Sequence, residues 1–427
     1  MNKFLAHLYS SLLLLLFIFP VNMHAQVLQL TGKNNSVNYE RLAKIDGLIN
    51  DYIKKDWVKG VVTIVVKDNQ VVQYNGYGYA NAATKDLMKK DELFRIASQT
   101  KALTATGIMI LFERGKLYLD EPVADFIPEF KNPVVLDKFN PEDSSYTTVP
   151  AKRNITIRDL LTHTSGIDYA GIGSENMRAI YSKAGLEPGF NLAKKGQTLL
   201  DAMRTLAKLP LVHQPGEKWT YGLNFDLLGC VIEVVSGKSL NDFLTENIFQ
   251  PVGMKDTYFN VPASKANRLA SIYTEDSLNH IIPWDKEKSR VDPDYPLIHK
   301  SYFSGGADLT STAYDYAQFL QMLLNGGTYN GHEILAPRTV QLMISNQLDF
   351  KFDGVNDFGL SFEVVSEKGA NRDPRNKGSF AWGGYWGTTY WADPKAHLVC
   401  LMMTQQTPNS HGELAQKFKD MVYASLK

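Results

Sequence analysis

Apolar positions divide the chain into two stretches of strand character with a long helical stretch between them. Valine-rich segments at 61–66 and 71–74 are separated by four polar residues, a pattern that predicts a β-hairpin. Strand patterns return near the other end of the chain, at 358–365, 388–392 and 397–403. Because successive strands with short connections pair antiparallel, the pattern predicts one antiparallel sheet built from both chain ends and flanked by helices.

From about Pro122 the strand patterns stop and helical patterns alternate with loops. Helices are expected at 42–57, from 157 to a glycine stop at Gly166, and at 226–236, 312–325 and 414–426. This order predicts an α/β (α+β) fold in which 36–121 and 300–427 form an α/β subdomain and 122–299 form a mainly helical subdomain. The two subdomains are expected to pack as a single catalytic unit over 26–427.

The first 25 residues have the pattern of a secretory signal peptide. Lys3 precedes an apolar run at 12–19, and Ala25 offers a small-residue cleavage site. The run is shorter than the ~20 apolar residues of a membrane-spanning helix, and no cysteine follows it as a lipoprotein anchor would require. We therefore expect a secreted or periplasmic protein without stable membrane insertion after signal removal.

Charge and cysteine content narrow the classes of function. The 45 basic and 45 acidic residues give a formal net charge of +0, whereas a nucleic-acid partner would require a basic excess. Cys230 and Cys400 both lie in apolar runs, which favours buried free thiols over the disulfide that export would permit. No histidine or cysteine spacing suits a metal ion. We expect neither metal nor cofactor, and a small-molecule ester or peptide-like substrate fits this balance of charges.

One serine and one lysine stand at the start of an apolar helix pattern. Ser98 lies in the opening turn, where a serine commonly caps a helix. Lys101 lies one turn later on the same face, where the helix dipole disfavours a cation by about 0.3–1 kcal/mol. An ammonium beside a hydroxyl lowers the cost of forming an alkoxide. The pair therefore predicts an activated serine nucleophile.

Two later stretches could complete a serine-based site. Tyr221 precedes the helix expected at 226–236; it is either a structural tyrosine or, beside the Lys101 ammonium, a general base that accepts the serine proton. Gly383 and Gly384 are either turn residues or part of an edge strand whose backbone N–H faces a reacting carbonyl. Each stretch alone leaves both interpretations open.

Five landmarks follow one another along the chain. They are Ser98-Gln99-Thr100-Lys101, the segment 160–166, Gln214-Pro215-Gly216 with Tyr221 and Leu227-Leu228-Gly229, the segment 304–312, and Trp382-Gly383-Gly384. In this order they resemble the landmarks of the class C β-lactamase-like serine hydrolases. That superfamily contains class C β-lactamases, DD-peptidases, D-amino-acid peptidases and family VIII carboxylesterases. The resemblance spans nearly all of the chain after the signal peptide and implies a β-lactamase/transpeptidase-like fold with its site in the groove between the two subdomains.

The resemblance also implies roles for individual residues. By motif position, Ser98 is the nucleophile, and Lys101 and Tyr221 form the acid/base pair. The backbone N–H groups of Ser98 and Tyr385 form the oxyanion hole. The serine is acylated and water then releases the acyl group. The segment 160–166 matches a motif whose role is architectural.

Two departures from the family pattern bear on the substrate. β-Lactamases and peptidases of the superfamily usually carry an asparagine two residues after the catalytic tyrosine, where it helps to bind an amide. Here that place holds Leu223, and Asn224 lies one residue later. They also usually carry Lys or His where this chain has Trp382, and losing a charged partner for a carboxylate costs about 1.5–3 kcal/mol. Cations that could replace it are Arg372, Arg375 and Lys377.

Both departures look more like the carboxylesterase branch. We expect the substrate to be bound by Trp382, Gly383, Gly384, Asn224 and Leu223. An aromatic wall of Trp382, Tyr385 and Trp386 would suit an apolar acyl or alcohol group.

Three hypotheses follow from the sequence. The first is an exported carboxylesterase that cleaves small or medium acyl esters through an acyl-Ser98 intermediate. The second is a β-lactamase or D-Ala-D-Ala or D-amino-acid peptidase acting on cell-wall-type amides. The third is a non-catalytic penicillin-binding or sensor domain, which would have no need of a lysine at a helix start.

Overall fold

The structure is a computed structural model of the 427-residue chain. It describes residues 27–30, 32–186, 196–288 and 291–427. The signal peptide expected at 1–25 lies outside the described residues. No helix of the described part has the length and apolar character needed to cross a membrane.

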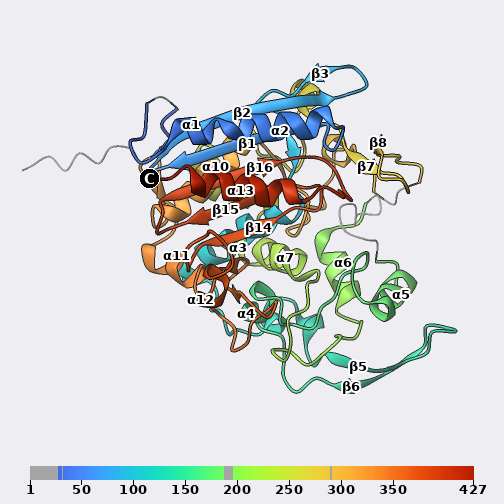
Figure 1. The fold of residues 1–427 in the computed structure, drawn as a ribbon. Helices are drawn as coiled ribbons and strands as arrows, with labels where there is room; N and C mark the ends of the chain where they lie inside the picture. Colours follow the sequence, from blue (N-terminus) through green and yellow to red (C-terminus); the bar gives the residue numbers. More distant parts are fainter. Residues whose placement is uncertain (1–26, 31, 187–195, 289–290) are drawn as a thin grey trace, which may run out of the picture.

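Eight antiparallel strands form one sheet in the order β12-β13-β14-β15-β16-β1-β2-β3. They are β1 (Gly60–Lys67), β2 (Gln70–Asn81), β3 (Asp86–Leu87), β12 (Asp357–Phe358), β13 (Glu363–Val364), β14 (Phe380–Gly383), β15 (Thr389–Asp393) and β16 (Leu398–Met403). The early strand β1 pairs with the late strand β16, so that Val62 lies opposite Met403. Figure 1 shows this junction, where blue strands lie beside red ones. The predicted antiparallel sheet built from both chain ends is therefore confirmed.

Strand β1 is apolar on both sides because helices cover both faces of the sheet. Val61 and Val65 belong to a hydrophobic cluster with Tyr52 and Phe418. On the opposite side, Ile64 belongs to the larger core that continues into the rest of the molecule. Successive side chains of a strand point to opposite faces, so a fully buried strand reads as the continuous apolar run seen in the sequence.

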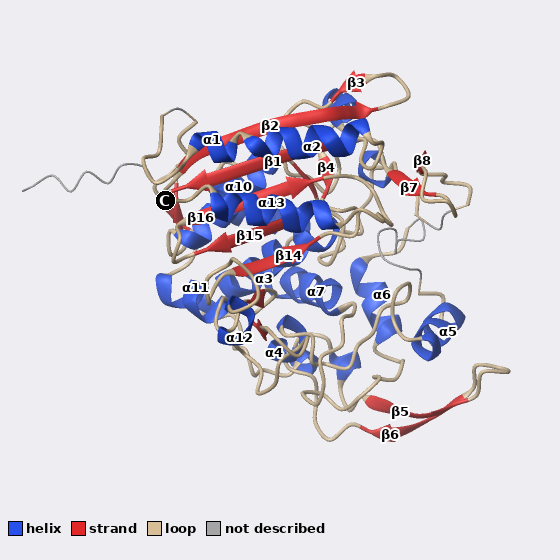
Figure 2. Ribbon diagram, in the orientation of Figure 1, coloured by secondary structure: helices blue, strands red, loops and turns tan. Residues whose placement is uncertain are grey.

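Helices lie on the two faces in a simple arrangement (Figure 2). On one face lie α1 (Tyr39–Leu42), α2 (Lys44–Lys54) and α13 (Glu413–Ala424). On the other, α10 (Ala313–Leu324) packs against β1 and β16, and α3 (Thr100–Glu113) packs against α7 (Asn224–Ser236). The remaining α-helices are α4 (Ile157–Leu161), α5 (Glu175–Lys183), α6 (Leu199–Leu206), α8 (Leu240–Leu244), α9 (Gln250–Val252), α11 (Pro337–Met343) and α12 (Glu367–Ala370).

Short turns of other helical types connect these elements. They are η1 (Ala97–Gln99), η2 (Val123–Asp125), η3 (Pro128–Phe130), η5 (Thr245–Phe249), η6 (Ala263–Arg268) and η7 (Tyr295–Leu297). Four further pairs of strands form two-stranded sheets apart from the main sheet. They are β4 (Phe94–Arg95) with β9 (Thr310–Ser311), β5 (Val134–Phe139) with β6 (Tyr146–Pro150), β7 (Tyr273–Glu275) with β8 (Ile281–Pro283), and β10 (Thr328–Tyr329) with β11 (His332–Glu333).

Two expectations from the pattern were wrong. Strands do not disappear after Pro122, because the β5–β6 hairpin projects from the helical part of the molecule (Figure 1). Every residue of β6 is exposed, so this hairpin has no apolar alternation to reveal it. The segment 358–365, expected as one strand, forms the two short strands β12 and β13, between which Ser361 takes a left-handed backbone conformation (φ 87°).

The strand β14 decides between the two interpretations of Gly383, which lies in a strand and not in a turn. It pairs with β13 at Phe380 and Ala381, and this pairing does not extend to Gly383. The end of β14 that carries Trp382 and Gly383 therefore offers a strand edge beside the site described next. Cys230 and Cys400 are buried and free, as predicted.

Candidate active site

Ser98 lies in the short turn η1, directly before α3. Its neighbour Ala97 takes a left-handed conformation (φ 44°), which is rare for a residue with a side chain. Between Glu92 and Leu111, Ser98 is the one residue that is not buried. The side chain makes no capping hydrogen bond, so the interpretation of Ser98 as a helix cap is wrong. A strained backbone that turns one hydroxyl outward is typical of functional sites.

Lys101 is 1% exposed and donates three hydrogen bonds. Its Nζ lies 2.7 Å from the carbonyl oxygen of Gly306, 3.0 Å from the hydroxyl of Tyr169 and 3.3 Å from Oγ of Ser98. Burial alone would lower the pKa of Lys101, but Tyr169 and Tyr221 face the ammonium and the net pKa lies above the ordinary value. The amine is therefore a fixed ammonium beside the serine.

Tyr221 reaches the same serine from the segment that precedes α7. Its hydroxyl donates to Oγ of Ser98 at 2.6 Å and accepts from Nε1 of Trp382 at 3.4 Å. The next residue, Gly222, allows this approach, because an added Cβ would lie 2.0 Å from the carbonyl oxygen of Ile167. The structure thus brings the three predicted residues Ser98, Lys101 and Tyr221 together.

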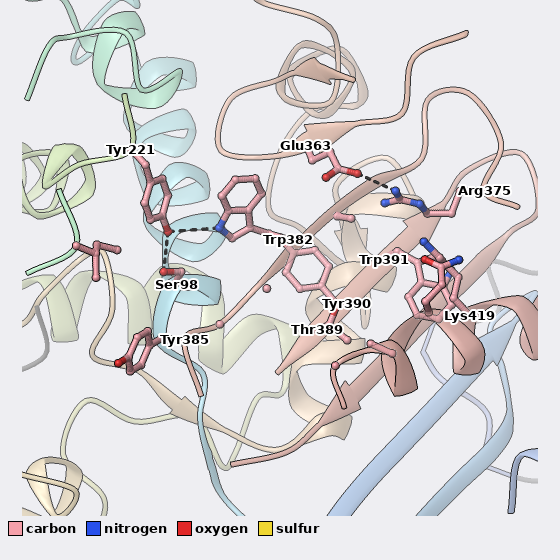
Figure 3. A pocket seen from close by; sticks show the side chains of 17 residues that line it. Ser98, Tyr221, Glu363, Arg375, Trp382, Tyr385, Thr389, Tyr390, Trp391 and Lys419 are labelled. Atoms are coloured by element: carbon pink, nitrogen blue, oxygen red, sulfur yellow. Dashed lines mark hydrogen bonds and ion pairs between the residues drawn. The ribbon is translucent and has the colours of Figure 1, made fainter. Parts of the chain in front are cut away.

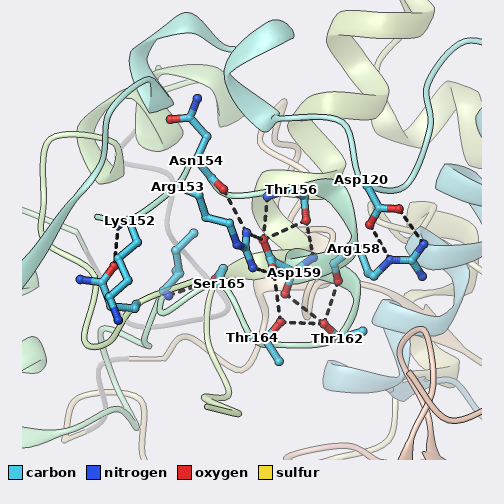
Figure 4. Close-up of polar contacts among 12 residues, drawn as sticks. Asp120, Lys152, Arg153, Asn154, Thr156, Arg158, Asp159, Thr162, Thr164 and Ser165 are labelled. Carbon is cyan, nitrogen blue, oxygen red and sulfur yellow. Dashed lines mark hydrogen bonds and ion pairs between the residues drawn. The ribbon is translucent and has the colours of Figure 1, made fainter. Parts of the chain in front are cut away.

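The segment 160–166 is held by polar contacts around Asp159 (Figure 4). Asp159 closes a capping box with Thr156 and accepts from Nη2 of Arg153 at 2.9 Å, and the hydroxyl of Thr164 donates to it at 3.3 Å. This network fixes the loop in which His163 follows, with its ring centroid 4.7 Å from that of Tyr221.

His163 takes no part as an acid or base at neutral pH. Burial, together with the charge of Lys101, holds the pKa of His163 well below its ordinary value. Its Nδ1 accepts from Nδ2 of Asn224 at 2.8 Å, and Oδ1 of Asn224 accepts from the hydroxyl of Ser165. These contacts fit the architectural role expected for the segment 160–166.

Two of the residues expected to bind substrate do not reach the pocket. Asn224 is fully buried, and both ends of its amide are used by His163 and Ser165. Leu223 is also fully buried in the hydrophobic core. The first turn of α7 points these side chains inward, and the sequence pattern alone gave no sign of that orientation.

A pocket of about 650 Å³ opens above Ser98 (Figure 3). Trp382, Gly383, Gly384 and Tyr385 line it together with Ser98 and Tyr221. Trp386 does not belong to the expected aromatic wall, since it is fully buried with its ring centroid 4.9 Å from that of Trp284. The wall therefore consists of Trp382 and Tyr385, with the exposed side chain of Ile172 at the rim.

The end of β14 lies close to the nucleophile. An added Cβ at Gly384 would lie 2.4 Å from the carbonyl oxygen of Ile96 and 2.3 Å from Oγ1 of Thr388. The N–H of Gly384 donates to the carbonyl of Thr388 at 2.8 Å. Because Gly384 packs this tightly, the backbone of Tyr385 is held at the same pocket as Ser98.

The far end of the pocket carries charged groups that are already paired. Nη2 of Arg375 lies 2.8 Å from Oε1 of Glu363, and its Nε lies 2.9 Å from Oδ1 of Asp373. Lys419, the other cation that lines the pocket, pairs with Asp373. Arg372 and Lys377 do not line it, and Lys377 pairs with Glu367 at 3.2 Å.

Tyr169 is the residue of this site that the sequence did not reveal. It lies in a loop without helix or strand periodicity, yet it is buried and accepts a hydrogen bond from Lys101. Burial raises the pKa of Tyr169, so its hydroxyl stays protonated. Within the described residues, no group of three or more His, Cys, Asp and Glu side chains is arranged to hold a metal ion.

The fold, the outward-turned serine and the lysine and tyrosine around it define a serine hydrolase of the β-lactamase fold. Comparison with known families agrees: the chain belongs to the family described as Beta-lactamase, whose model matches residues 45–420.

Individual relatives cover most of the chain. Protein Rv1367c of Mycobacterium tuberculosis is 34% identical over 368 residues, which cover 82% of this chain and 87% of the relative. Esterase EstB of Burkholderia gladioli is 28% identical, covering 90% of this chain and 95% of its own. A putative D-alanyl-D-alanine carboxypeptidase of Escherichia coli K12 is 28% identical, and the match covers 91% of this chain and 92% of the relative.

Among solved structures, EstCE1 is similar over 90% of this chain and 99% of its own, with a TM-score of 0.77 and 26% identity. It is described as a hydrolase with promiscuous acyltransferase activity.

Proposed function

We propose that this serine hydrolase is a carboxylesterase that cleaves small or medium acyl esters through an acyl-enzyme on Ser98. The observation that carries the proposal is the convergence of two side chains on one hydroxyl: Tyr221 at 2.6 Å and Lys101 at 3.3 Å from Oγ of Ser98. A nucleophile within hydrogen-bond reach of a base that other groups orient is the general signature of covalent catalysis.

In the proposed mechanism, the Tyr221 hydroxyl first gives up its proton to solvent. The resulting phenolate oxygen, 2.6 Å from Oγ of Ser98, then takes the serine proton while Oγ attacks the ester carbonyl. The Lys101 ammonium stabilises the negative charge that develops around these oxygens. The N–H groups of Ser98 and Tyr385 would hold the oxyanion, since both residues border the pocket. The proton then passes to the departing alcohol oxygen, and water repeats the sequence to release the acid.

The preference for a neutral ester rests on the lining of the pocket. Trp382 occupies the place beside Tyr221, and its Nε1 lies 3.4 Å from the Tyr221 hydroxyl. The cations Arg375 and Lys419 are already neutralised by Glu363 and Asp373. A substrate carboxylate would therefore have to break an existing ion pair, whereas an apolar group needs only the aromatic wall. The esterase activity named for EstB supports the same substrate class.

A second function, amide hydrolysis on cell-wall-type peptides or β-lactams, uses the same three residues. The Escherichia coli relative named as a putative carboxypeptidase favours it. The paired cations and Trp382 argue against it.

From the pattern of residues 1–25 we also propose that the protein is exported to the periplasm or secreted.

The test is intact-mass spectrometry of the protein after a fluorophosphonate and, separately, after a penicillin, with Ser98→Ala as control. We expect a fluorophosphonate adduct that the variant lacks, turnover of a p-nitrophenyl ester and no penicillin adduct or hydrolysis. A lasting penicillin adduct, or faster turnover of a D-Ala-D-Ala peptide or a cephalosporin, would establish the amide function. If neither reagent forms an adduct and no substrate turns over, the protein is a binding domain.

A further inference from the structure

The buried ammonium of Lys101 lacks a negative partner in direct contact. Its three hydrogen bonds go to the hydroxyls of Ser98 and Tyr169 and to the carbonyl of Gly306, none of which carries a charge in its ordinary state. Among the described residues, no carboxylate lies within ion-pair distance of Nζ. A charge removed from water in this way is costly unless an opposite charge lies nearby.

A carboxylate in the same situation lies on the helix packed against α3. Asp226, in the first turn of α7, is 1% exposed. Within the described part of the chain it forms no ion pair, and its Oδ1 has no hydrogen-bond partner. Buried carboxylates without an ion pair are rare. The two packed helices α3 and α7 therefore carry two buried charges of opposite sign, neither of which has a counter-charge in direct contact among the residues that the structure describes.

Gly306 places the two charges on either side of one small space. A Cβ added to Gly306 would lie 2.8 Å from Oδ2 of Asp226 and 3.5 Å from both Nζ of Lys101 and the hydroxyl of Tyr169. Its carbonyl already accepts from Lys101. Only a residue without a side chain leaves the carboxylate and the ammonium facing each other across this gap.

We propose that Asp226 is the counter-charge of Lys101: a positioning residue that keeps the lysine protonated and thereby holds it ready to stabilise the serine alkoxide. This inference rests on the proposed catalytic role of Ser98 and Lys101. Tyr169 and Tyr221 face the ammonium and help to keep the pKa of Lys101 above its ordinary value, and the carboxylate of Asp226 adds a charge of opposite sign to this environment. An opposite charge within 4–6 Å favours the charged form of a partner by about one to three pKa units.

The surroundings of Asp226 determine the pH at which this support is lost. Burial raises the pKa of Asp226 to about 6, against a hydrogen bond from Ser304 and the charge of Lys101, which both lower it, while Asp308 raises it further. Tyr302 and Tyr169 also face this carboxyl, and both stay protonated because burial raises the pKa of each. Protonation of Asp226 near pH 6 should therefore remove the negative charge that stabilises the Lys101 ammonium, so that activity falls below this pH.

The experiment compares pH profiles of kcat/KM for ester hydrolysis and rates of fluorophosphonate labelling in the wild-type chain, Asp226→Asn and Gly306→Ala. The control is Asp315→Asn, which removes a second buried carboxyl that does not line the pocket. For Asp226→Asn we expect at least a tenfold lower kcat/KM at pH 8, loss of the acid-side inflection near pH 6 and a basic limb lower by about one pH unit. Asp315→Asn should keep the wild-type profile.

Gly306→Ala provides a second test if Asp226→Asn does not fold. The added methyl group pushes the Asp226 carboxylate away from the ammonium but leaves the carboxylate in place. We expect a shift in the same direction and of smaller size. If the wild-type chain labels at Ser98 and the folded variants keep its pH profile, Asp226 is not the counter-charge and this inference is wrong. If the wild-type chain itself does not label at Ser98, the proposed function fails instead, so the two failures are distinguishable.

Discussion

The hydroxyl of Tyr221 lies 2.6 Å from Oγ of Ser98, although 123 residues separate the two in the sequence. Ser98 stands before α3, and Tyr221 stands before α7, and these two helices pack against each other. The candidate site therefore forms only when the part of the chain that carries the sheet and the part that carries the helices are docked. The activation of the Ser98 hydroxyl therefore depends on tertiary structure and not on the local helix alone.

Replacing Tyr221 by phenylalanine should slow acylation by a factor of about 10² to 10⁴, because a general base of the proposed kind is removed with little change in packing. Tyr169→Phe is the matched control: it removes a hydroxyl that contacts Lys101 without a hydrogen bond to Ser98 in the structure. Its effect should be at least tenfold smaller. Pre-steady-state kinetics with a p-nitrophenyl ester measures both. Equal losses in the two variants would show that Tyr221 acts only by orienting Lys101.

Much of the fold was predictable from the sequence because its signals are periodic. The valine runs of β1 and the apolar spacing of α7 and α10 identify elements that are buried on both faces or along one stripe. The hairpin β5–β6 could not be found in this way, since every residue of β6 is exposed and Val135 is the one fully buried residue of β5. The sequence left β14 undecided because glycine has a high turn propensity, while its strand conformation here comes from pairing with β15.

The sequence predicted the catalytic residues, because the chemistry requires particular residue types. It did not predict which substrate-binding side chains point into the pocket, because that depends on their orientation. Ser98, Lys101 and Tyr221 are reactive side chains in ordered landmarks, and the structure brings them together. Asn224 carries an equally suggestive amide, but α7 turns it inward to Ser165 and His163. Whether a side chain at a helix start faces a pocket or the core depends on the packing of the whole helix, which no local motif records.

Gly384→Ala should lower kcat far more than it raises KM. Its new Cβ would lie 2.4 Å from the carbonyl oxygen of Ile96, so the end of β14 and the N–H of Tyr385 must move away from the nucleophile. Losing one oxyanion donor costs about 10²- to 10³-fold in kcat. The control is Gly383→Ala, whose Cβ would meet only the carbonyl of Thr388 at 3.2 Å. Steady-state kinetics on one ester should separate the two variants, and similar losses in both would remove Tyr385 from the oxyanion hole.

Trp382→Lys should move the substrate preference towards carboxylates. Arg375 and Lys419, the cations that line the pocket, already form ion pairs with Glu363 and Asp373. A lysine introduced at position 382 would add a cation that can pair with a substrate carboxylate. A charged hydrogen bond of about 1.5–3 kcal/mol corresponds to roughly 10- to 100-fold in affinity. The KM for a p-nitrophenyl hemisuccinate should fall by that factor relative to the uncharged butyrate, and Trp382→Phe should leave the ratio unchanged. A ratio that does not move in the lysine variant would place the carboxylate site elsewhere.

Asp315 should make the stability of the fold depend on pH between about 4 and 7. It lies in the first turn of α10, accepts from the backbone N–H of Asp256 at 2.6 Å, and is 5% exposed. Burial raises the pKa of Asp315 to about 7, although hydrogen bonds from Asp256 and Thr257 oppose the shift.

An unfolded aspartate has a pKa of about 3.9, so the folded state binds the Asp315 proton more tightly. The stabilisation from this proton is complete below pH 4 and is lost as the pH rises through 7. An asparagine cannot ionise and avoids that loss. The free energy of unfolding of Asp315→Asn, measured by urea titration relative to that of the wild-type chain, should therefore increase by about 2–4 kcal/mol between pH 4 and pH 8.5, so that the variant gains relative stability. Comparing the two proteins at each pH cancels the many other titrating groups, and a difference that stays constant would mean that Asp315 ionises as readily in the folded chain as in the unfolded one.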